Sequence, residues 1–460
     1  MSELSKMFCP RSIAIIGASK SPKKIGYELV NNLLEGGFEG RLYPVNPEGV
    51  DIAGLKTYIS VKQIPGPVDL GVIAVPSVYV PDVVEECGQK GIANVIIISS
   101  GFREMGNDEL EARVVSIANK YKIRLLGPNI FGLLYTPSRM NATFGLPNVY
   151  PGGIAFITQS GALGIAMMGW TTLYRIGVSA VVSMGNKADL DEADILDYLS
   201  CDEKTKAVMM YIEGTQNGRR LMSSIRKTVL NKPVVVIKSG RTEKGAAAAA
   251  SHTGSLAGTD KIYDAAFRQS GALRADDFAQ AFDWAKMVTL QQPPQNENCV
   301  IITNGGGVGV MTTDACEEAK INVWPLPEDL QNEFKKLMPV FGNFRNPVDL
   351  TGQAYEESYY KSLELALKEP RIGSIIALYC QTAVTDPVAI AKYIGDVCEA
   401  HGNSKTIVAS FVGGQLCSDA MKKLDERSIP TYPIPERAVS ALAAFYRYKR
   451  FIDSKKAQTV

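Results

Sequence analysis

The segment SIAIIG at residues 12–17 decides the fold, because it is a short apolar run that ends in glycine. A helical pattern follows it at residues 25–34. Apolar β-branched runs that alternate with helical stretches are typical of βαβ units and predict a parallel sheet. We therefore expect an α/β protein that begins with a Rossmann-like domain at residues 1–147. The other strands predicted in this block are 41–46, 68–76, 93–99 and 123–127, and a second helix is predicted at 80–90.

Two further blocks show the same alternation and resemble each other. Residues 158–164 (TQSGALG) align with residues 303–309 (TNGGGVG), and each segment follows a predicted strand and opens a helix. A polar linker, QQPPQNEN, separates the blocks. We interpret them as two flavodoxin-like parallel-sheet domains at residues 148–290 and 299–460. Their predicted strands are 154–158, 178–185, 207–213 and 233–239, then 299–303, 374–380 and 406–412.

The bulk composition excludes several classes of protein. Lys and Arg number 49 against 48 Asp and Glu, so we expect neither nucleic acid nor a membrane as a partner. No apolar run approaches the roughly 20 residues that span a bilayer, and the N-terminus lacks the apolar core of a signal peptide. The eight cysteines are scattered, which favours reduced thiols and a cytoplasmic location. Cys398 and His401 have no second pair of ligands, so we expect no metal site.

The turn after the first predicted strand has the composition of a phosphate-binding loop. Small residues at a helix N-terminus let backbone N–H groups meet a phosphate. The dinucleotide fingerprint fails, however, because Ser19 and Pro22 stand where it needs glycines. Asn46 follows the second strand, where an NAD site would place an acidic residue. We therefore expect a phosphate-bearing nucleotide other than NAD, with an unliganded turn as the alternative.

His252 has unusual neighbours. Residues 245–258 read GAAAAASHTGSLAG, and this run offers little apolar area to bury. We predict a slender, mobile loop that presents one imidazole. Imidazole can carry a phosphoryl group when a carboxylate fixes its tautomer, and Glu213, at the end of a predicted strand, is the best-placed acid. A flexible surface loop and a surface acid remain the alternatives. His401 lies where a helix should end, and capping explains it.

Two more strand-end loops can face phosphate. Residues 158–162 supply N–H groups and the Ser160 hydroxyl at a helix start, and residues 238–241 supply positive charge. Both can equally be ordinary turns. A hydrolase triad of Ser160, Glu213 and His252 is disfavoured, because Thr158 and Ala162 replace the glycines of the nucleophile elbow.

Several of these motifs resemble known families. The strand-end segments SIAIIGAS, YPVNP, VIAVPS, IISSGF and LLGPN resemble the CoA-binding domain of the succinyl-CoA synthetase superfamily. The segment SHTGSLAG at residues 251–258, together with YIEG and VIKSGRT, resembles the alpha subunit of ADP-forming acetyl-CoA synthetases. This second resemblance covers essentially the whole chain.

The resemblance implies a function and a set of site residues. It implies interconversion of acyl-CoA, ADP and phosphate with acid, CoA and ATP, through an acyl phosphate and a phosphohistidine. His252 would be phosphorylated with support from Glu213, while Asn129, Ser160 and Gly161 would bind phosphate. The implied contacts to coenzyme A or acyl-CoA are Gly17, Ala18, Ser19, Asn46, Pro47, Val75, Pro76, Ser99, Ser100 and Gly101.

The resemblance also implies a partner, because we find no ATP-grasp domain in the sequence. A separate beta subunit would bind ADP or ATP with Mg, giving an α2β2 hetero-oligomer, and the third domain would be a scaffold and a subunit contact. The alternative function is a non-catalytic module that binds or senses CoA and needs no reactive histidine.

Overall fold

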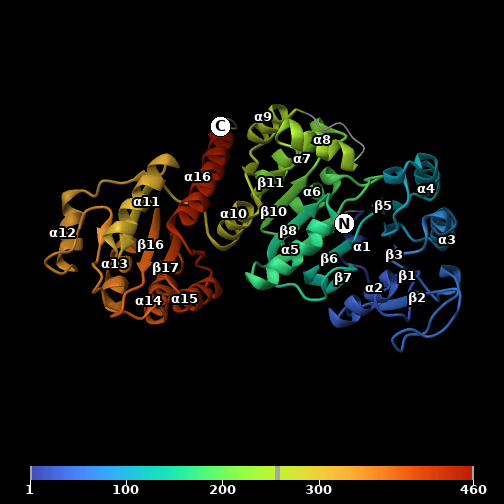
Figure 1. Cartoon of the computed structure of the whole chain (residues 1–460), viewed down its shortest axis with the longest axis horizontal. Coiled ribbons are helices and arrows are strands. Elements are labelled where there is room, and N and C mark those ends of the chain that lie inside the picture. The colour runs from blue at the N-terminus through green and yellow to red at the C-terminus, as the bar shows by residue number, and fades with distance from the viewer. Residues whose placement is uncertain (1–2, 254–258, 458–460) are drawn as a thin grey trace. The chain divides into compact units, whose positions relative to one another are not determined.

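The computed structural model describes residues 3–253 and 259–457, and the side chains of all of these except residues 249–253. The chain divides into two compact units, Met1–Arg274 and Ala275–Val460. Three mainly parallel sheets follow one another along the described part of the chain (Figure 1). The predicted α/β class is therefore confirmed.

The first sheet has the strand order β2-β1-β3-β4-β5, and every neighbouring pair is parallel. All residues of β1, β3 and β4 are buried, because helices cover both faces of a doubly wound sheet. This explains why the strands read as continuous apolar runs. The elements are α1 (Ser5–Phe8), β1 (Ser12–Ile16), α2 (Ile25–Glu35), β2 (Arg41–Val45), β3 (Leu70–Ile73), α3 (Val80–Lys90), β4 (Asn94–Ile97), α4 (Asp108–Tyr121) and β5 (Arg124–Leu126).

The second sheet has the order β12-β11-β10-β8-β9-β6-β7. Two antiparallel strands extend its parallel part at one edge: β6 pairs antiparallel with β9, and β7 pairs antiparallel with β6. These two strands precede residue 147 in the chain. The elements are β6 (Gly132–Tyr135), β7 (Met140–Thr143), β8 (Pro151–Thr158), α5 (Gly161–Leu173), β9 (Val178–Ser183), α6 (Glu192–Ser200), β10 (Ala207–Ile212), α7 (Gly218–Val229), β11 (Val234–Lys238), α9 (Asp260–Ser270) and β12 (Leu273–Ala275).

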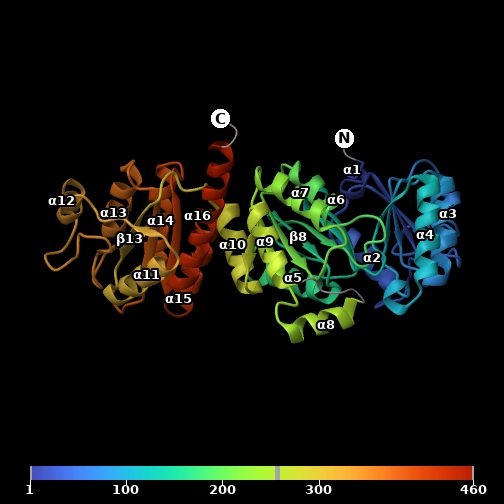
Figure 2. The same cartoon turned by 90° about the horizontal axis from the view of Figure 1, so that it is seen from above.

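The predicted loop around His252 is wrong over residues 245–253, which belong to helix α8 (Glu243–Thr253). Five consecutive alanines favour the helix, because alanine has the highest helix propensity. The only glycine within α8, Gly245, lies in the first turn, where its N–H donates to Thr242 Oγ1 (3.1 Å). Figure 2 shows α8 projecting away from the sheet. Residues 254–258, the rest of the predicted loop, lie outside the described residues.

The second unit repeats the pattern with the strand order β14-β13-β16-β17-β18, and β15 pairs with β13. Helix α10 packs here against α16, where Asp283 accepts two hydrogen bonds from Arg437 (2.6 and 2.7 Å). The predicted domain boundaries stay predictions. The elements are α10 (Phe278–Leu290), β13 (Asn298–Thr303), α11 (Gly306–Glu318), β14 (Asn322–Val323), α12 (Glu328–Lys336), β15 (Val348–Asp349), α13 (Glu356–Lys368), β16 (Ser374–Cys380), α14 (Pro387–Ala400), β17 (Thr406–Val412), α15 (Gln415–Glu426), β18 (Thr431–Tyr432) and α16 (Pro435–Ala457).

Candidate active site

The candidate site lies at the carboxyl ends of β8, β9 and β10. After β8 the chain moves to β9 on one side, and it then returns to β10 on the other side of β8. Neighbouring strands whose connections leave in opposite directions form a topological switch point, where open α/β sheets bind their ligands. The carboxyl ends of β8 and β10 are therefore the place in the second sheet where this rule predicts a ligand site.

Gln159 joins the two strand ends that flank the switch point. Its Oε1 accepts hydrogen bonds from the N–H groups of Glu213 (2.7 Å) and Gly214 (3.1 Å). Its Nε2 donates to Gly214 O (2.8 Å) and to the carboxylate of Glu192. The side chain therefore holds the turn after β8 and the turn after β10 in one fixed arrangement.

Ser160 and Gly161 form the start of helix α5. Thr158 Oγ1 shapes the turn, because it accepts from Ser160 N (3.1 Å) and donates to Ser160 O (2.9 Å). The Ser160 hydroxyl caps the helix by accepting from Leu163 N at 3.4 Å. The N-terminus of this 13-residue helix offers backbone N–H groups and the positive end of its dipole to an anion.

Glu213 is nearly buried, with 9% of its surface exposed. Burial raises the pKa of the neighbouring Tyr211, a hydrogen bond with Ser239 opposes this rise, and the charge of Glu213 and its hydrogen bond with Tyr211 add to it. Lys238 is 2% exposed, and its Nζ lies 4.6 Å from the centre of the Tyr263 ring. Burial lowers the pKa of Lys238, although the charges of Asp260 and, to a smaller extent, Glu213 oppose this effect. Glu213 therefore lies near one half-buried and one buried polar side chain.

A buried ion pair supports the site, and the sequence reasoning missed it. Lys187 Nζ lies 2.8 Å from Glu192 Oε1 and donates to Gly214 O at 3.0 Å. The two side chains are only 12% and 1% exposed. The available signal was the polar pair Asn-Lys at 186–187 directly after the predicted strand 178–185, because open α/β sheets bind their ligands at the carboxyl ends of their strands.

We expect Lys187→Met to destabilise the first unit by about 3–5 kcal/mol, since it leaves the Glu192 carboxylate buried without its cation. Urea unfolding of the full chain measures this change. The double variant Lys187→Met/Glu192→Gln should recover more than half of the loss, because it removes both charges. Equal stabilities of the single and double variants would contradict the role of the pair.

Asn129 reaches the same edge from the first sheet. It follows β5 with a φ of +63°, and its N–H donates to Ser99 O (2.9 Å). Its Nδ2 donates to Asn186 Oδ1 (3.4 Å), in the loop after β9. The structure therefore brings the predicted phosphate residues to neighbouring loops, and their contact with phosphate stays a prediction.

The predicted CoA residues share the carboxyl edge of the first sheet. Gly17 has a φ of +93°, and a Cβ on Gly26 would lie 1.9 Å from Gly17 O, so the N-terminus of α2 lies directly against this turn. Ala18 is buried and its carbonyl accepts from Asn46 Nδ2 (2.8 Å), while Pro47 is exposed. Asn46 therefore shapes the turn.

The turns after β3 and β4 complete this edge. Ser99 Oγ donates to Val75 O (2.5 Å) and joins the two turns. Gly101 has a φ of +108°, and a Cβ there would lie 2.7 Å from Ser77 Oγ. The remaining predicted CoA residues at this edge are Ser19, whose Oγ accepts from Ser21 N, and Pro76 and Ser100, which are exposed. The CoA contacts themselves stay predictions.

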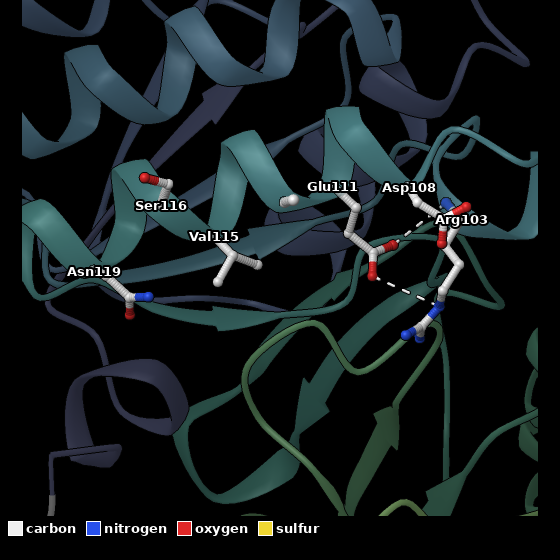
Figure 3. A pocket seen from close by; sticks show the side chains of 7 residues that line it. Arg103, Asp108, Glu111, Val115, Ser116 and Asn119 are labelled. Carbon is white, nitrogen blue, oxygen red and sulfur yellow. Dashed lines mark hydrogen bonds and ion pairs between the residues drawn. The ribbon is translucent and has the colours of Figure 1, made fainter.

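A depression of about 510 Å³ lies along α4 (Figure 3). Within the described residues its lining includes none of the predicted site residues, and it contains an ion pair between Arg103 and Glu111 at 3.7 Å. The lining residues are Arg103, Asp108, Glu111, Ala112, Val115, Ser116 and Asn119.

His252 is the next-to-last residue of α8, and its side chain lies outside the described residues. Within 3–253 and 259–457, no group of three or more His, Cys, Asp or Glu side chains is arranged to hold a metal ion. Over the same residues, no helix combines the length and apolar character needed to cross a membrane.

Three family models match successive parts of the chain. A CoA binding domain matches residues 11–136, a succinyl-CoA ligase like flavodoxin domain matches residues 151–288, and a ligase-CoA domain matches residues 299–455. A CoA-binding domain followed by two ligase domains defines a CoA ligase subunit.

Individual relatives narrow this class. The alpha subunit of ADP-forming acetate–CoA ligase I from Pyrococcus furiosus is 52% identical over 97% of this chain and 98% of its own length. A solved structure of acetyl-coenzyme A synthetase 1 from Ca. Korarchaeum cryptofilum, in complex with phosphate and ADP, superimposes with a TM-score of 0.97 at 46% identity and covers both chains fully. The ADP-forming acetate–CoA ligase of Methanocaldococcus jannaschii is 40% identical over 97% of this chain, which spans 63% of that protein. The chain belongs to the family of alpha subunits of ADP-forming acetate–CoA ligases.

Proposed function

We propose that this chain carries out the acyl-transfer and phosphohistidine steps of an ADP-forming acyl-CoA synthetase, with His252 as the phosphorylated residue. The observation that carries the proposal is the joint position of the α5 N-terminus and Glu213 at adjacent strand ends. The β8–β10 register pairs Thr158 with Tyr211, and Gln159 bridges the next residues of both strands. An anion at the helix start would therefore lie at the strand end next to the one that carries Glu213.

In the first step, phosphate binds at the start of α5, with Ser160, Gly161 and Asn129 as its ligands. A phosphate oxygen attacks the thioester carbonyl of acyl-CoA, the carbon–sulfur bond breaks, and CoA leaves as the thiol after it gains a proton. The helix dipole and the N–H groups stabilise the anionic acyl phosphate that results.

In the second step, a ring nitrogen of His252 attacks the phosphorus of the acyl phosphate, and the free acid leaves. Glu213 accepts a hydrogen bond from the other ring nitrogen, which fixes the tautomer and stabilises the positive charge on the phosphorylated ring. The position of His252 near the end of a helix that projects from the sheet suits a group that moves between two sites.

In the third step, the phosphoryl group passes to ADP on a partner. We assign the nucleotide and its Mg to a beta subunit with an ATP-grasp domain, in an α2β2 assembly in which the third domain provides scaffold and subunit contacts. The longer Methanocaldococcus jannaschii relative supports a nucleotide-binding part outside this chain. A cytoplasmic location is supported by the eight cysteines, which are all free.

The test is incorporation of labelled phosphate into the chain from acetyl-CoA and inorganic phosphate, without nucleotide. We expect a label that acid removes and base does not, and we expect His252→Ala to lose it. His401→Ala is the matched control, because His401 caps α14 and lies 3.7 Å from Glu364, and this variant should keep the label.

An absence of label in the wild-type chain, also with a beta subunit present and with several acyl-CoAs, would overturn the proposal. A chain that binds CoA without becoming labelled would be a non-catalytic CoA-binding module. Label that persists in His252→Ala would show that another residue carries the phosphoryl group.

A further inference from the structure

Asn186, in the loop after β9, connects the two candidate ligand sites. Its side chain is 8% exposed, and its Nδ2 donates to Glu104 Oε2 (2.6 Å) and to Glu111 Oε2 (2.8 Å). Its Oδ1 accepts from Asn129 Nδ2. Both polar atoms of this amide therefore bond to residues around the first sheet: the turn after β4, helix α4 and the loop after β5.

The acceptor Glu104 belongs to the turn that holds the predicted CoA residues. Its other oxygen, Oε1, accepts from the N–H groups of Gly101 (2.5 Å) and Phe102 (3.1 Å). Burial alone would raise the pKa of Glu104, but the hydrogen bonds from Asn186, Gly101 and Phe102 outweigh burial and lower it. The carboxylate therefore stays charged, and its hydrogen bonds connect the Asn186 side chain to the backbone of Gly101.

The second acceptor, Glu111, is held in place by Arg103. Figure 3 shows the Glu111 carboxylate turned toward Arg103, whose backbone N–H donates to it at 3.4 Å. The Arg103 guanidinium also donates to Asn186 O. Hydrogen bonds made by both the backbone and the side chain of Asn186 thus hold the loop after β9 against residues 103–111.

The same loop contacts the phosphate side. A Cβ on Gly185 would lie 2.1 Å from Pro128 O and 2.6 Å from Asn129 O, so the loop is pressed against the residues before β6. Lys187 donates to Gly214 O, next to Glu213. Residues 185–187 therefore contact the predicted CoA turn, Asn129 and the Glu213 turn at once.

We infer that Asn186 is a positioning residue for the acyl-transfer step. It fixes the distance between the Gly101 turn, which would hold CoA, and Asn129, which would hold phosphate. This inference rests on the proposed function. Because the phosphoryl transfer to His252 needs no CoA, Asn186 should matter for the first step and much less for the second.

The test uses Asn186→Asp in the full chain, with phosphohistidine formed from two alternative donors. The change keeps the shape of the side chain but removes both N–H donors and places three carboxylates together. We expect labelling from acetyl-CoA and labelled phosphate to fall about 100-fold or more, since two hydrogen bonds to charged groups are lost. Labelling from labelled acetyl phosphate, which bypasses the CoA step, should fall less than about 10-fold.

The matched control is Asn32→Asp, which also buries a new charge. Asn32 is 1% exposed and donates to two carbonyls, Thr143 O and Gly145 O, away from the site. It should leave the ratio between the two donors unchanged, whatever it does to stability. Equal losses with both donors in Asn186→Asp, or no loss with acetyl-CoA, would overturn the positioning role. If the wild-type chain takes up no label from acetyl-CoA with phosphate and none from acetyl phosphate, the proposed function itself would be overturned.

Discussion

Glu213→Gln should slow phosphohistidine formation by about 10³- to 10⁴-fold, which is the usual cost of removing the carboxylate behind a reactive imidazole. Glutamine keeps the shape of the side chain, and its backbone N–H still reaches Gln159. The loss would therefore come from the missing negative charge, which no longer stabilises the phosphorylated ring. Single-turnover labelling from acetyl phosphate measures this step without the beta subunit.

Glu203→Gln is the control for this prediction, because Glu203 is exposed in the turn after α6. It should label at the wild-type rate. A Glu213→Gln variant that labels within about threefold of the wild type would show that another group supports the histidine, and Tyr211 and Lys238 would then be the next side chains to test.

Gly26→Ala should weaken CoA binding by about 100-fold. The added Cβ would overlap Gly17 O at 1.9 Å and approach Ala18 Cα at 3.0 Å. Backbone atoms cannot swing aside as a side chain can, so either the Gly17 turn or the start of α2 must move. Overpacking of this kind usually costs 1–3 kcal/mol or more, and about 1.4 kcal/mol corresponds to a tenfold change in affinity. Calorimetric titration with CoA measures the loss.

Gly218→Ala is the matched control, since Gly218 is also a glycine at the start of a helix, and the nearest atom to its added Cβ, Thr215 Cγ2, is 3.8 Å away. This variant should bind CoA normally and unfold at the wild-type urea concentration or above it. Normal CoA binding by Gly26→Ala would mean that the turn after β1 does not form part of the CoA site.

Much of the fold was predictable from local patterns. The apolar runs at 12–17 and 93–99 became β1 and β4, because continuous apolar segments between turn residues are buried on both faces of a parallel sheet. Helix α3 begins and ends where the pattern predicted it, at residues 80–90. The prediction of a loop at 245–253 was wrong because the helix propensity of the alanine run outweighs the effect of one glycine in the first turn.

The site was predictable only in part. Ser160 and Glu213 were recognisable as polar residues at strand ends, and the edge of a parallel sheet brings such residues together. Lys187 and Asn186 were not recognised: their place at a strand end was a usable signal, but it does not distinguish a supporting residue from an ordinary surface turn. Their roles depend on partners that are far away in the chain.

Local patterns in the sequence were enough to predict the buried parallel strands, helix α3 and the glycine turn after β1, because these depend on propensities and periodicities of residues close together in the chain. The tertiary structure decided which strand ends are neighbours. Only that order places Gln159 against Gly214, 55 residues away, and Asn186 against Glu104, 82 residues away. The physical reason is that a buried hydrogen bond requires its two groups to meet in space, and the sheet topology sets that meeting.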